Sequence, residues 1–242
     1  APAPETLRYT PPEDVVAAAK QAGAQSIAYT YTEPTIFMEY ALDCARLAHD
    51  ENIANVFVSN GYETPEAVES MAGLVDAANV DLKAFSDEFY REQCKAHLDP
   101  VKETIRNMFE AGIHLEVTTL VIPDLNDSED ELEALAEFLA DVSPDIVWHI
   151  SRFHPQYKVV DRDATFPSSL ELAARKGREA GLRYIYLGNV LTRDGQVTHC
   201  PECNEVLIRR SGFGRPDIRI NEAQCPSCGH TIPVQLADLH IL

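Results

Sequence analysis

The stretch Ser26-Ile27-Ala28-Tyr29-Thr30-Tyr31-Thr32-Glu33-Pro34 begins as an apolar segment and ends in a polar, charged turn. Its first half is rich in residues that favour a half-buried strand. Pro34 ends the strand, because proline cannot donate to a sheet ladder and disfavours helix at the residue before it. A helix is predicted from Thr35 onwards. Glu33 is therefore expected at the carboxyl end of a strand, where parallel sheets gather ligand-binding groups; the alternative is that Glu33 only caps the helix.

Five further strand-like segments follow this one, and a helical pattern separates each from the next. Alternation of this kind predicts an α/β fold with a parallel sheet or barrel. Right-handed crossovers would place the carboxyl ends of all the strands on one rim. The predicted strands are Ile27–Tyr31, Asn55–Ser59, Asn79–Leu82, His114–Ile122, Ile146–Ile150 and Tyr184–Leu187.

Several helix ends can be predicted from capping residues. Thr64 precedes a proline and an acidic residue, and Ser128 precedes a run of acids, so each is expected to cap the helix that follows. Thr10 is a candidate cap for a helix that starts at Pro12. Ser168 or Ser169 is expected to cap the last helix, which Gly181 would end.

Polar residues stand at the ends of the predicted strands. Isolated polar residues occur at any strand end, but here acids, amides, a lysine and a histidine recur from strand to strand. Asp81 and Lys83 are two positions apart and therefore share one face of their strand. Polar groups that converge on one rim are typical of a binding mouth. The residues are Glu33, Asn60, Asp81, Lys83, Thr118, Thr119, Arg152, His154 and Asn189.

Composition narrows the class of protein. Hydrophobic residues make up 45% of the 242 positions, which indicates a globular chain. The formal net charge of -19 argues against a nucleic-acid partner, because binding a phosphate backbone requires a basic surface. The sequence shows neither an apolar run long enough to span a membrane nor the features of a signal peptide.

Four of the six cysteines form two close pairs near the C-terminus, Cys200-Pro-Glu-Cys203 and Cys225-Pro-Ser-Cys228. Each pair is predicted to make a tight turn, and the Asn or Gly that follows tolerates a left-handed backbone. Four thiolates form a closed tetrahedral site, which favours structural zinc. Iron of the rubredoxin type is the rival ion, and disulfides are a weaker alternative. Metal ligation by thiols indicates a reducing compartment, and we expect the cytoplasm.

The other two cysteines carry no such pattern. Cys44 lies in a predicted helix among apolar residues and is expected to be a small buried thiol. Cys94 has no partner at a ligand spacing. The predicted order also begins with a helix, although a βα sheet should begin with a strand. Because residues 1–11 are rich in proline, we expect the first strand to be absent from this chain; a natural start in a proline-rich tail is the alternative.

The order of the short motifs resembles a known family, the radical S-adenosylmethionine enzymes related to the pyruvate formate-lyase activating enzyme. Within that group the chain is similar to the radical enzyme of the AmmeMemoRadiSam system. The resemblance covers nearly the whole chain. The motifs that carry it are IAYTYTEPTI (27–36), VSNG (58–61), VDLK (80–83), TTLVIPDLNDS (118–128), WHISRFHP (148–155), YLGNV (186–190) and the terminal cysteine pairs.

The resemblance implies a partial (β/α)6 TIM-like barrel, here lacking its first strand, over residues 1–190, and a small zinc-ribbon-like module over residues 191–242. It also implies a [4Fe-4S] cluster held by a Cys-x3-Cys-x2-Cys loop, which cleaves S-adenosylmethionine to a 5'-deoxyadenosyl radical. This chain contains no such loop. The chain alone is therefore expected to lack the cluster and its activity. The implied partners are an unknown substrate and the Memo and AMMECR-type proteins of the same system.

The resemblance also assigns binding residues position by position. Thr32 and Glu33 correspond to the segment that meets the amino group of the cofactor, and a carboxylate suits an ammonium group. Lys83, beside Asp81, would meet the cofactor's carboxylate. The full predicted set is Thr32, Glu33, Asn60, Asp81, Lys83, Thr119 and His154 for S-adenosylmethionine, and Cys200, Cys203, Cys225 and Cys228 for zinc.

Two other classes of function compete with this one. The chain could be a non-catalytic adaptor that carries a metal ribbon on a degenerate barrel, although the polar rim argues against degeneration. It could also be a barrel enzyme acting on phosphosugars, but no glycine-rich phosphate loop supports that reading.

Overall fold

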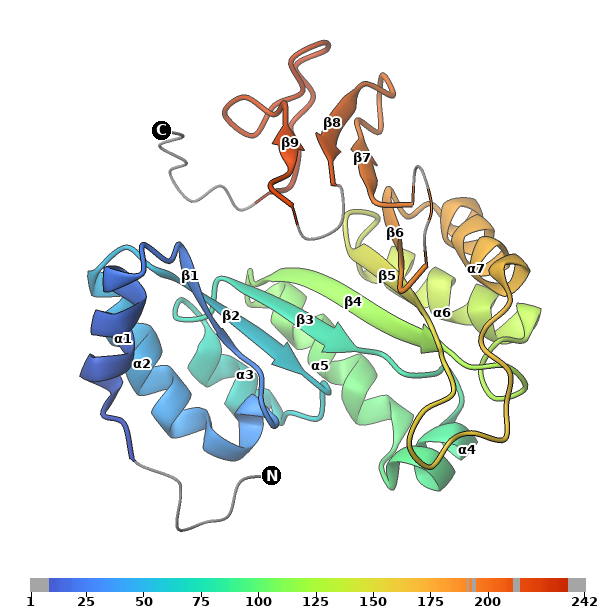
Figure 1. Ribbon diagram of the computed structural model, residues 1–242, viewed down its shortest axis with the longest axis horizontal. Helices are drawn as coiled ribbons and strands as arrows, with labels where there is room; N and C mark the ends of the chain where they lie inside the picture. Colours follow the sequence, from blue (N-terminus) through green and yellow to red (C-terminus); the bar gives the residue numbers. More distant parts are fainter. Residues whose placement is uncertain (1–8, 191, 193–194, 211–213, 235–242) are drawn as a thin grey trace.

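A parallel sheet of six strands forms the centre of the protein in a computed structural model that describes residues 9–190, 192, 195–210 and 214–234. The strands follow one another across the sheet in chain order, and each neighbouring pair is parallel. This is the predicted partial barrel of βα units (Figure 1). Its strands are β1 (Ser26–Tyr29), β2 (Ala54–Ser59), β3 (Ala77–Asp81), β4 (His114–Val121), β5 (Val147–Arg152) and β6 (Tyr184–Gly188).

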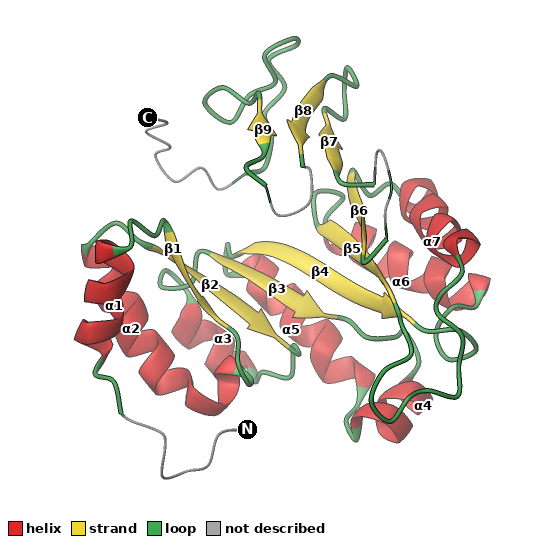
Figure 2. Cartoon of the chain, in the orientation of Figure 1, coloured by secondary structure: helices red, strands yellow, loops and turns green. Residues whose placement is uncertain are grey.

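Helices connect the strands and cover one face of this sheet, whereas a second, smaller sheet lies beyond the other face (Figure 2). No helix in the described part of the chain is long and apolar enough to cross a membrane. The helices are α1 (Pro12–Gln21), η2 (Pro34–Phe37), α2 (Met38–Asp50), α3 (Pro65–Met71), α4 (Asp87–Phe89), η3 (Tyr90–Cys94), α5 (Leu98–Glu110), α6 (Glu129–Val142) and α7 (Pro167–Ala180).

Alternation along the strands decides which side chains are buried. In β4, Leu115 and Val117 are buried against the helices. Glu116 and Thr118, which alternate with these two residues, are half-buried on the opposite face, which we call the open face. Because side chains alternate along a strand, each strand presents one apolar row and one mainly polar row. The open face can therefore bind ligands while the helical face holds the core.

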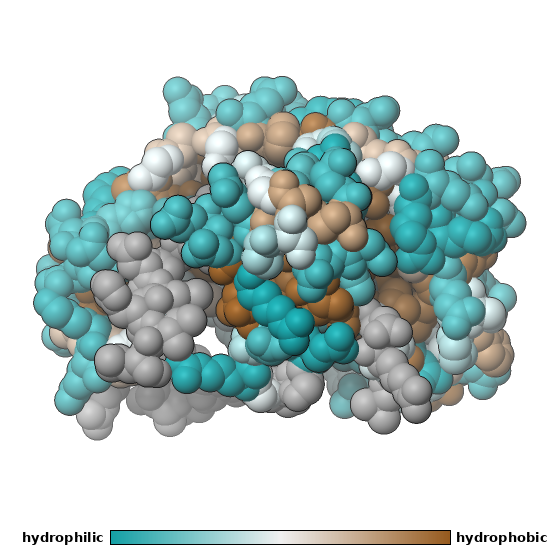
Figure 3. Space-filling view, turned by 90° about the horizontal axis from the view of Figure 1, so that it is seen from above, coloured by the Kyte–Doolittle hydropathy of each residue, from teal (hydrophilic) through white to brown (hydrophobic). Residues whose placement is uncertain are grey.

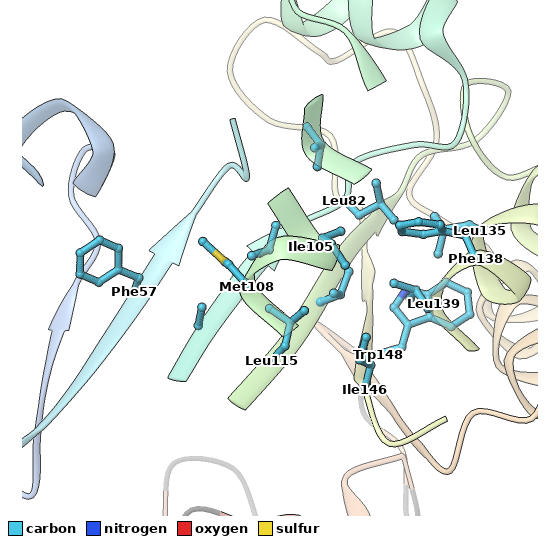
Figure 4. Packing of buried hydrophobic residues seen from close by; sticks show 14 of the residues in the cluster. Phe57, Leu82, Ile105, Met108, Leu115, Leu135, Phe138, Leu139, Ile146 and Trp148 are labelled. Atoms are coloured by element: carbon cyan, nitrogen blue, oxygen red, sulfur yellow. The ribbon is translucent and has the colours of Figure 1, made fainter. Parts of the chain in front are cut away.

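The core between sheet and helices extends from β1 to β6. Figure 4 shows part of it, from Phe57 of β2 to Trp148 of β5. Trp148 is fully buried and donates from Nε1 to the Thr119 hydroxyl at 3.0 Å. Gly177 lets α7 approach this ring: a Cβ at that position would lie 2.6 Å from Ile185 and 3.0 Å from Trp148. A larger residue would therefore push α7 away from the sheet.

The ribbon is a three-stranded antiparallel sheet of β7 (Val197–His199), β8 (Val206–Arg209) and β9 (Asp217–Ile218). Strands β8 and β9 lie between the two cysteine pairs, and β7 directly precedes the first pair. Seen from the side on which the ribbon lies, the periphery of the molecule is mostly hydrophilic (Figure 3). The predicted domain boundary falls at Leu191, which lies outside the described residues.

Contacts with β6 hold the ribbon against the barrel. The Leu187 amide donates to the Gly195 carbonyl at 2.8 Å. The Tyr186 hydroxyl lies 2.6 Å from the Thr198 hydroxyl, and the Arg210 guanidinium stacks 5.0 Å above the Tyr186 ring. These contacts place the ribbon beside the open face.

The capping predictions are half right. Thr64 and Ser128 accept hydrogen bonds from the amides of Ala67 at 3.3 Å and Glu131 at 3.4 Å, so both caps are confirmed. The prediction for Thr10 is wrong, since Pro11 occupies the N-cap of α1 and makes no side-chain cap. The prediction of Ser168 or Ser169 is also wrong. Proline is favoured in the first turn, and α7 begins one residue earlier than Ser168, at Pro167.

The predicted absence of a first strand concerns residues that are in part outside the described ranges. Within the described part, β1 lies at one edge of the sheet and pairs with β2. Helix α1 precedes it, as predicted, and residues 1–8 are not described.

Candidate functional site

Glu33 and Asn60 meet at the ends of β1 and β2. The Asn60 amide donates to Glu33 Oε2 at 2.9 Å. The other oxygen of the carboxylate, Oε1, accepts from the Thr35 hydroxyl at 2.9 Å and from the Thr35 amide at 3.3 Å. Glu33 thus caps η2 and also lies on the predicted rim, so the two interpretations of this residue are compatible. Glu33 is half-buried, and Thr32 and Asn60 beside it are exposed.

Asp81 and Lys83 form an ion pair at the end of the neighbouring strand β3. Lys83 Nζ lies 2.8 Å from Asp81 Oδ2, which confirms that the two side chains share a face. The Lys83 amide donates to the Tyr90 hydroxyl at 3.0 Å, which ties the strand end to η3. A cavity of about 380 Å³ opens beside the pair, lined by Asp81, Lys83, Phe89, Gln93, Cys94, Thr118, Leu120 and Ile122.

Cys94, to which the sequence assigned no function, is half-buried in the wall of this cavity. Burial raises the pKa of its thiol, and the positive charge of Lys83 partly opposes that rise. The thiol is therefore neutral around pH 7. It belongs to the π-helical segment η3, and such segments are common at functional sites.

The two threonines of β4 point to opposite faces. Thr118 lies on the open face and donates to Asn79 Oδ1 at 2.8 Å. Thr119 is only 1% exposed on the helical face, where its hydroxyl donates to the Leu82 carbonyl at 2.9 Å and accepts from Trp148. The placement of Thr119 favours a structural function over the predicted contact with a cofactor.

Replacing Thr119 by valine should therefore lower the free energy of unfolding without affecting ligand binding. The change leaves the buried Trp148 N–H and the Leu82 carbonyl without their partner, which costs about 1–3 kcal/mol. Thr118→Val, on the half-exposed face, should cost less than about 1 kcal/mol. Urea unfolding followed by circular dichroism measures both variants, and an equal cost for the two would contradict the assignment of faces.

His154 and Asn189 tie together the ends of β5 and β6. His154 is exposed, and its Nε2 lies 3.2 Å from the Asn189 carbonyl. The side-chain amide of Asn189 donates from Nδ2 to Ser151 Oγ at 2.9 Å. Arg152 points elsewhere: its Nε donates to the Thr165 carbonyl at 2.9 Å and so anchors the loop after β5. His154 thus remains on the rim, whereas Arg152 supports a loop.

An acid–histidine cluster on the open face was missed by the sequence analysis. His149 Nε2 lies 2.7 Å from Glu116 Oε2, and His114 lies 3.9 Å from the same carboxylate. The Tyr186 ring packs 5.5 Å from the His149 ring. Arg210 completes the wall of a cavity of about 340 Å³ that Glu116, His149 and Tyr186 also line. The signal is that Glu116, His149 and Tyr186 all occupy positions that face the open side of their strands. It becomes visible only when the pairing of β4, β5 and β6 is known.

The Glu116 cluster should make folding stability depend on pH. Burial disfavours the Glu116 carboxylate, but the hydrogen bond with His149 and the nearby His114 together outweigh burial and hold its pKa far below the usual range. A carboxylate with a depressed pKa stabilises the fold above its unfolded pKa, and the contribution is lost as pH falls toward the folded value. We expect Glu116→Gln to cost about 1 kcal/mol at pH 7, because the 37% exposure of the side chain screens the interaction.

Urea unfolding between pH 7 and pH 3 tests this expectation. The difference in unfolding free energy between the wild type and Glu116→Gln should shrink below about pH 4.3, the ordinary pKa of glutamate. Glu103→Gln is the matched control, because Glu103 is exposed on α5. A difference that stays constant over this pH range would contradict the assigned pKa direction.

The four C-terminal cysteines converge on one point of the ribbon. Their sulfur atoms all lie within 4.8 Å of one another. The pairs Cys200–Cys228 and Cys203–Cys225 are separated by 3.6 Å, too far for a disulfide bond of about 2.0 Å. That spacing is close to the edge of about 3.8 Å of a tetrahedron with metal–sulfur bonds of 2.3 Å. The sulfurs can therefore hold one metal ion.

The backbone of the two cysteine turns is as predicted. Asn204 and Gly229 adopt positive φ angles of 61° and 74°. Their amides donate to the carbonyls of Cys200 and Cys225, each at 2.9 Å. Each turn therefore directs its two thiols toward the same point.

A family model and several known proteins match this chain. Residues 2–139 match the family model of the Radical SAM superfamily. An uncharacterized protein of Methanocaldococcus jannaschii is 38% identical over 93% of this chain and 68% of its own length. The benzylsuccinate synthase activating enzyme of Thauera aromatica is 28% identical over 44% of this chain and 33% of its own length, so the chain spans about a third of that relative.

A solved structure shows the same fold. A domain of the pyruvate-formate lyase-activating enzyme of Bacteroides vulgatus superposes with a TM-score of 0.60 and 16% identity, over 67% of this chain and 98% of that one. The predicted partial barrel is thereby confirmed. The family model, which matches more than half of the chain, and the activating-enzyme relative show, together with the six parallel strands, that this chain belongs to the radical SAM superfamily of enzymes.

Proposed function

We propose that this chain holds S-adenosylmethionine in a radical SAM enzyme of the activating-enzyme type. The observation that carries the proposal is the arrangement of opposite charges along the rim. Glu33, fixed by Asn60 and Thr35 at the end of β1, offers an anion. Lys83, at the end of β3, offers a cation beside a cavity of about 380 Å³. An ammonium group and a carboxylate on one ligand require such a pair.

The residues of the chain fit this cofactor in their chemistry. Glu33 would accept a hydrogen bond from the ammonium group, and Lys83, which Asp81 orients, would donate to the carboxylate. Thr32 and Asn60 flank Glu33 as exposed polar groups, and His154 would face the nucleoside part from the end of β5. When bound and given one electron, S-adenosylmethionine supplies a 5'-deoxyadenosyl radical that abstracts hydrogen from a substrate.

The residues do not fit a [4Fe-4S] cluster. Cys44 is fully buried within α2, and Cys94 stands alone in the cavity wall. The remaining four cysteines face one another in the ribbon. We therefore assign no step to a cluster held by these residues, and the cluster ligands of the working enzyme would come from outside this sequence.

The ribbon ion is proposed to be zinc with a structural function. Four thiolates at tetrahedral spacing leave no open coordination position. Thiolate ligands persist in a reducing compartment, and we therefore propose that the protein is located in the cytoplasm. From the resemblance of the sequence motifs, we also propose that the chain belongs to the AmmeMemoRadiSam system and that the Memo and AMMECR-type proteins are its partners.

Turnover by the product of the complete reading frame tests the proposal. That protein would be loaded with iron and sulfide under anaerobic conditions, reduced, and mixed with S-adenosylmethionine. The expected products are methionine and 5'-deoxyadenosine, and Glu33→Gln should lower their rate at limiting cofactor. A cluster-loaded, reduced protein that forms neither product would contradict the proposal.

A further inference from the structure

Glu63 is a buried carboxyl group in the loop between β2 and α3. It is only 6% exposed. Its Oε1 lies within hydrogen-bond distance of the hydroxyl of Ser59 and, at 3.2 Å, of that of Thr35. Thr104 of α5 fixes its backbone by accepting from the Glu63 amide at 3.3 Å and donating to the Glu63 carbonyl at 3.1 Å. The sequence analysis missed this residue, because an acid just before the Thr64–Pro65 helix start looks like an ordinary surface residue.

Thr35 connects this buried group to the rim. Its hydroxyl lies 2.9 Å from Glu33 Oε1 and 3.2 Å from Glu63 Oε1. A hydroxyl has one proton to donate. If both carboxyl groups were ionised, one of them would lose this hydrogen bond and the two negative charges would repel each other. If Glu63 carries a proton, it can donate to Thr35, and Thr35 can donate to Glu33.

The surroundings of Glu63 favour its neutral form. Its Oε2 is buried without a hydrogen-bond partner among the described residues, which is costly for an ionised carboxylate. Burial raises the pKa of Glu63, and the Glu33 charge raises it further, against the hydrogen bonds from Ser59 and Thr35. Glu33 is the charged group that faces Glu63, whereas β2, η2 and α5 contribute the hydroxyls of Ser59, Thr35 and Thr104.

We propose that Glu63 is a positioning residue: through Thr35 it holds the Glu33 carboxylate in the orientation that accepts an ammonium group from a ligand. The inference rests on the proposed function for the identity of that ligand, the methionine end of S-adenosylmethionine. Glu63 itself does not touch the ligand, because its free oxygen is buried. Its contribution is to supply the proton that lets Thr35 donate toward Glu33.

Calorimetric titration of the chain with S-adenosylmethionine tests the proposal. Glu63→Gln keeps the shape and a donor toward Thr35, so its affinity should stay within about twofold of the wild type. Glu63→Ala and Thr35→Val break the link and should each weaken binding by about fivefold to twentyfold. The double variant should bind no more weakly than Thr35→Val alone, because both changes remove the same link. Glu66→Ala is the matched control, an exposed acid in the next helix.

Two outcomes would overturn the inference. One is a loss of affinity in Glu63→Gln as large as in Glu63→Ala, which would mean that an ionised Glu63 is needed. The other is wild-type affinity in Thr35→Val. If Glu63→Ala does not fold, Thr35→Val still tests the link from the other side.

A second measurement separates this inference from the proposed function. If the wild type does not bind S-adenosylmethionine, the proposed function fails. Hydrogen exchange of the Asn60 backbone amide then tests whether Glu63 positions the Glu33 carboxylate. That amide is bonded to Glu33 Oε2 and reports how firmly the carboxylate is held. Its exchange should be slow in the wild type and Glu63→Gln and about tenfold faster in Glu63→Ala and Thr35→Val. Equal rates in all four proteins would overturn the positioning function.

Discussion

Replacing Glu33 by glutamine should weaken the binding of S-adenosylmethionine by about tenfold to a hundredfold. The substitution keeps the size of the side chain but removes the charge that would meet the ammonium group. A hydrogen bond between charged groups contributes about 1.5–3 kcal/mol, and about 1.4 kcal/mol corresponds to tenfold in affinity. Isothermal titration calorimetry on the chain measures the dissociation constant directly.

Glu39→Gln is the control for this change, because Glu39 is an exposed acid in the first turn of α2. It should bind like the wild type. Glu33→Gln should also stay folded, since the amide oxygen can still accept from Asn60 or Thr35. Equal affinities of Glu33→Gln and Glu39→Gln for S-adenosylmethionine would show that Glu33 does not bind the ligand.

Removal of the ribbon ion should unfold the ribbon and leave the barrel intact. The apolar cluster of the ribbon is small, with Leu207 and Ile232 packed around two of the cysteines. Structural zinc contributes about 10–16 kcal/mol in isolated zinc-finger peptides, far more than such a cluster. The barrel has its own continuous core and does not need the ion. We expect Cys203→Ser, or treatment with a chelator, to produce this partial unfolding.

Metal analysis and two-dimensional amide NMR spectra measure this effect. The wild type should contain about one zinc ion per chain. Cys203→Ser should lose the dispersed signals of β7 to β9 and keep those of β1 to β6. Cys94→Ser is the control, since Cys94 lies in the barrel cavity, and it should retain the ion. A ribbon that stays folded without metal would contradict the structural function of the ion.

The fold could be predicted because its signals are local. Strand and helix patterns alternate along the chain, and capping residues such as Thr64 and Ser128 mark helix starts through contacts within four residues. That Asp81 and Lys83 share a face followed from alternation along one strand, and the structure adds that they form an ion pair. The cysteine turns are also local, and the positive φ of Asn204 could be anticipated from the residue type.

The parts that could not be predicted depend on contacts between distant segments. Thr118 and Thr119 are the same residue type, and only the packing of Trp148 against one of them distinguishes the faces. The burial of Glu63 results from Thr35 and Thr104, which come from separate elements. The Glu116–His149 contact requires the pairing of β4 with β5. No pattern within a single segment contains such information.

The central claim is that the ends of β1, β2 and β3 hold the amino-acid end of S-adenosylmethionine. Titration of the cofactor into the chain, followed by two-dimensional amide NMR, tests it most directly. We predict saturable shifts of the amides of Glu33, Asn60 and Lys83, and no such shifts in Glu33→Gln at the same concentrations. Saturable shifts confined to the ribbon, or none at all, would contradict the claim.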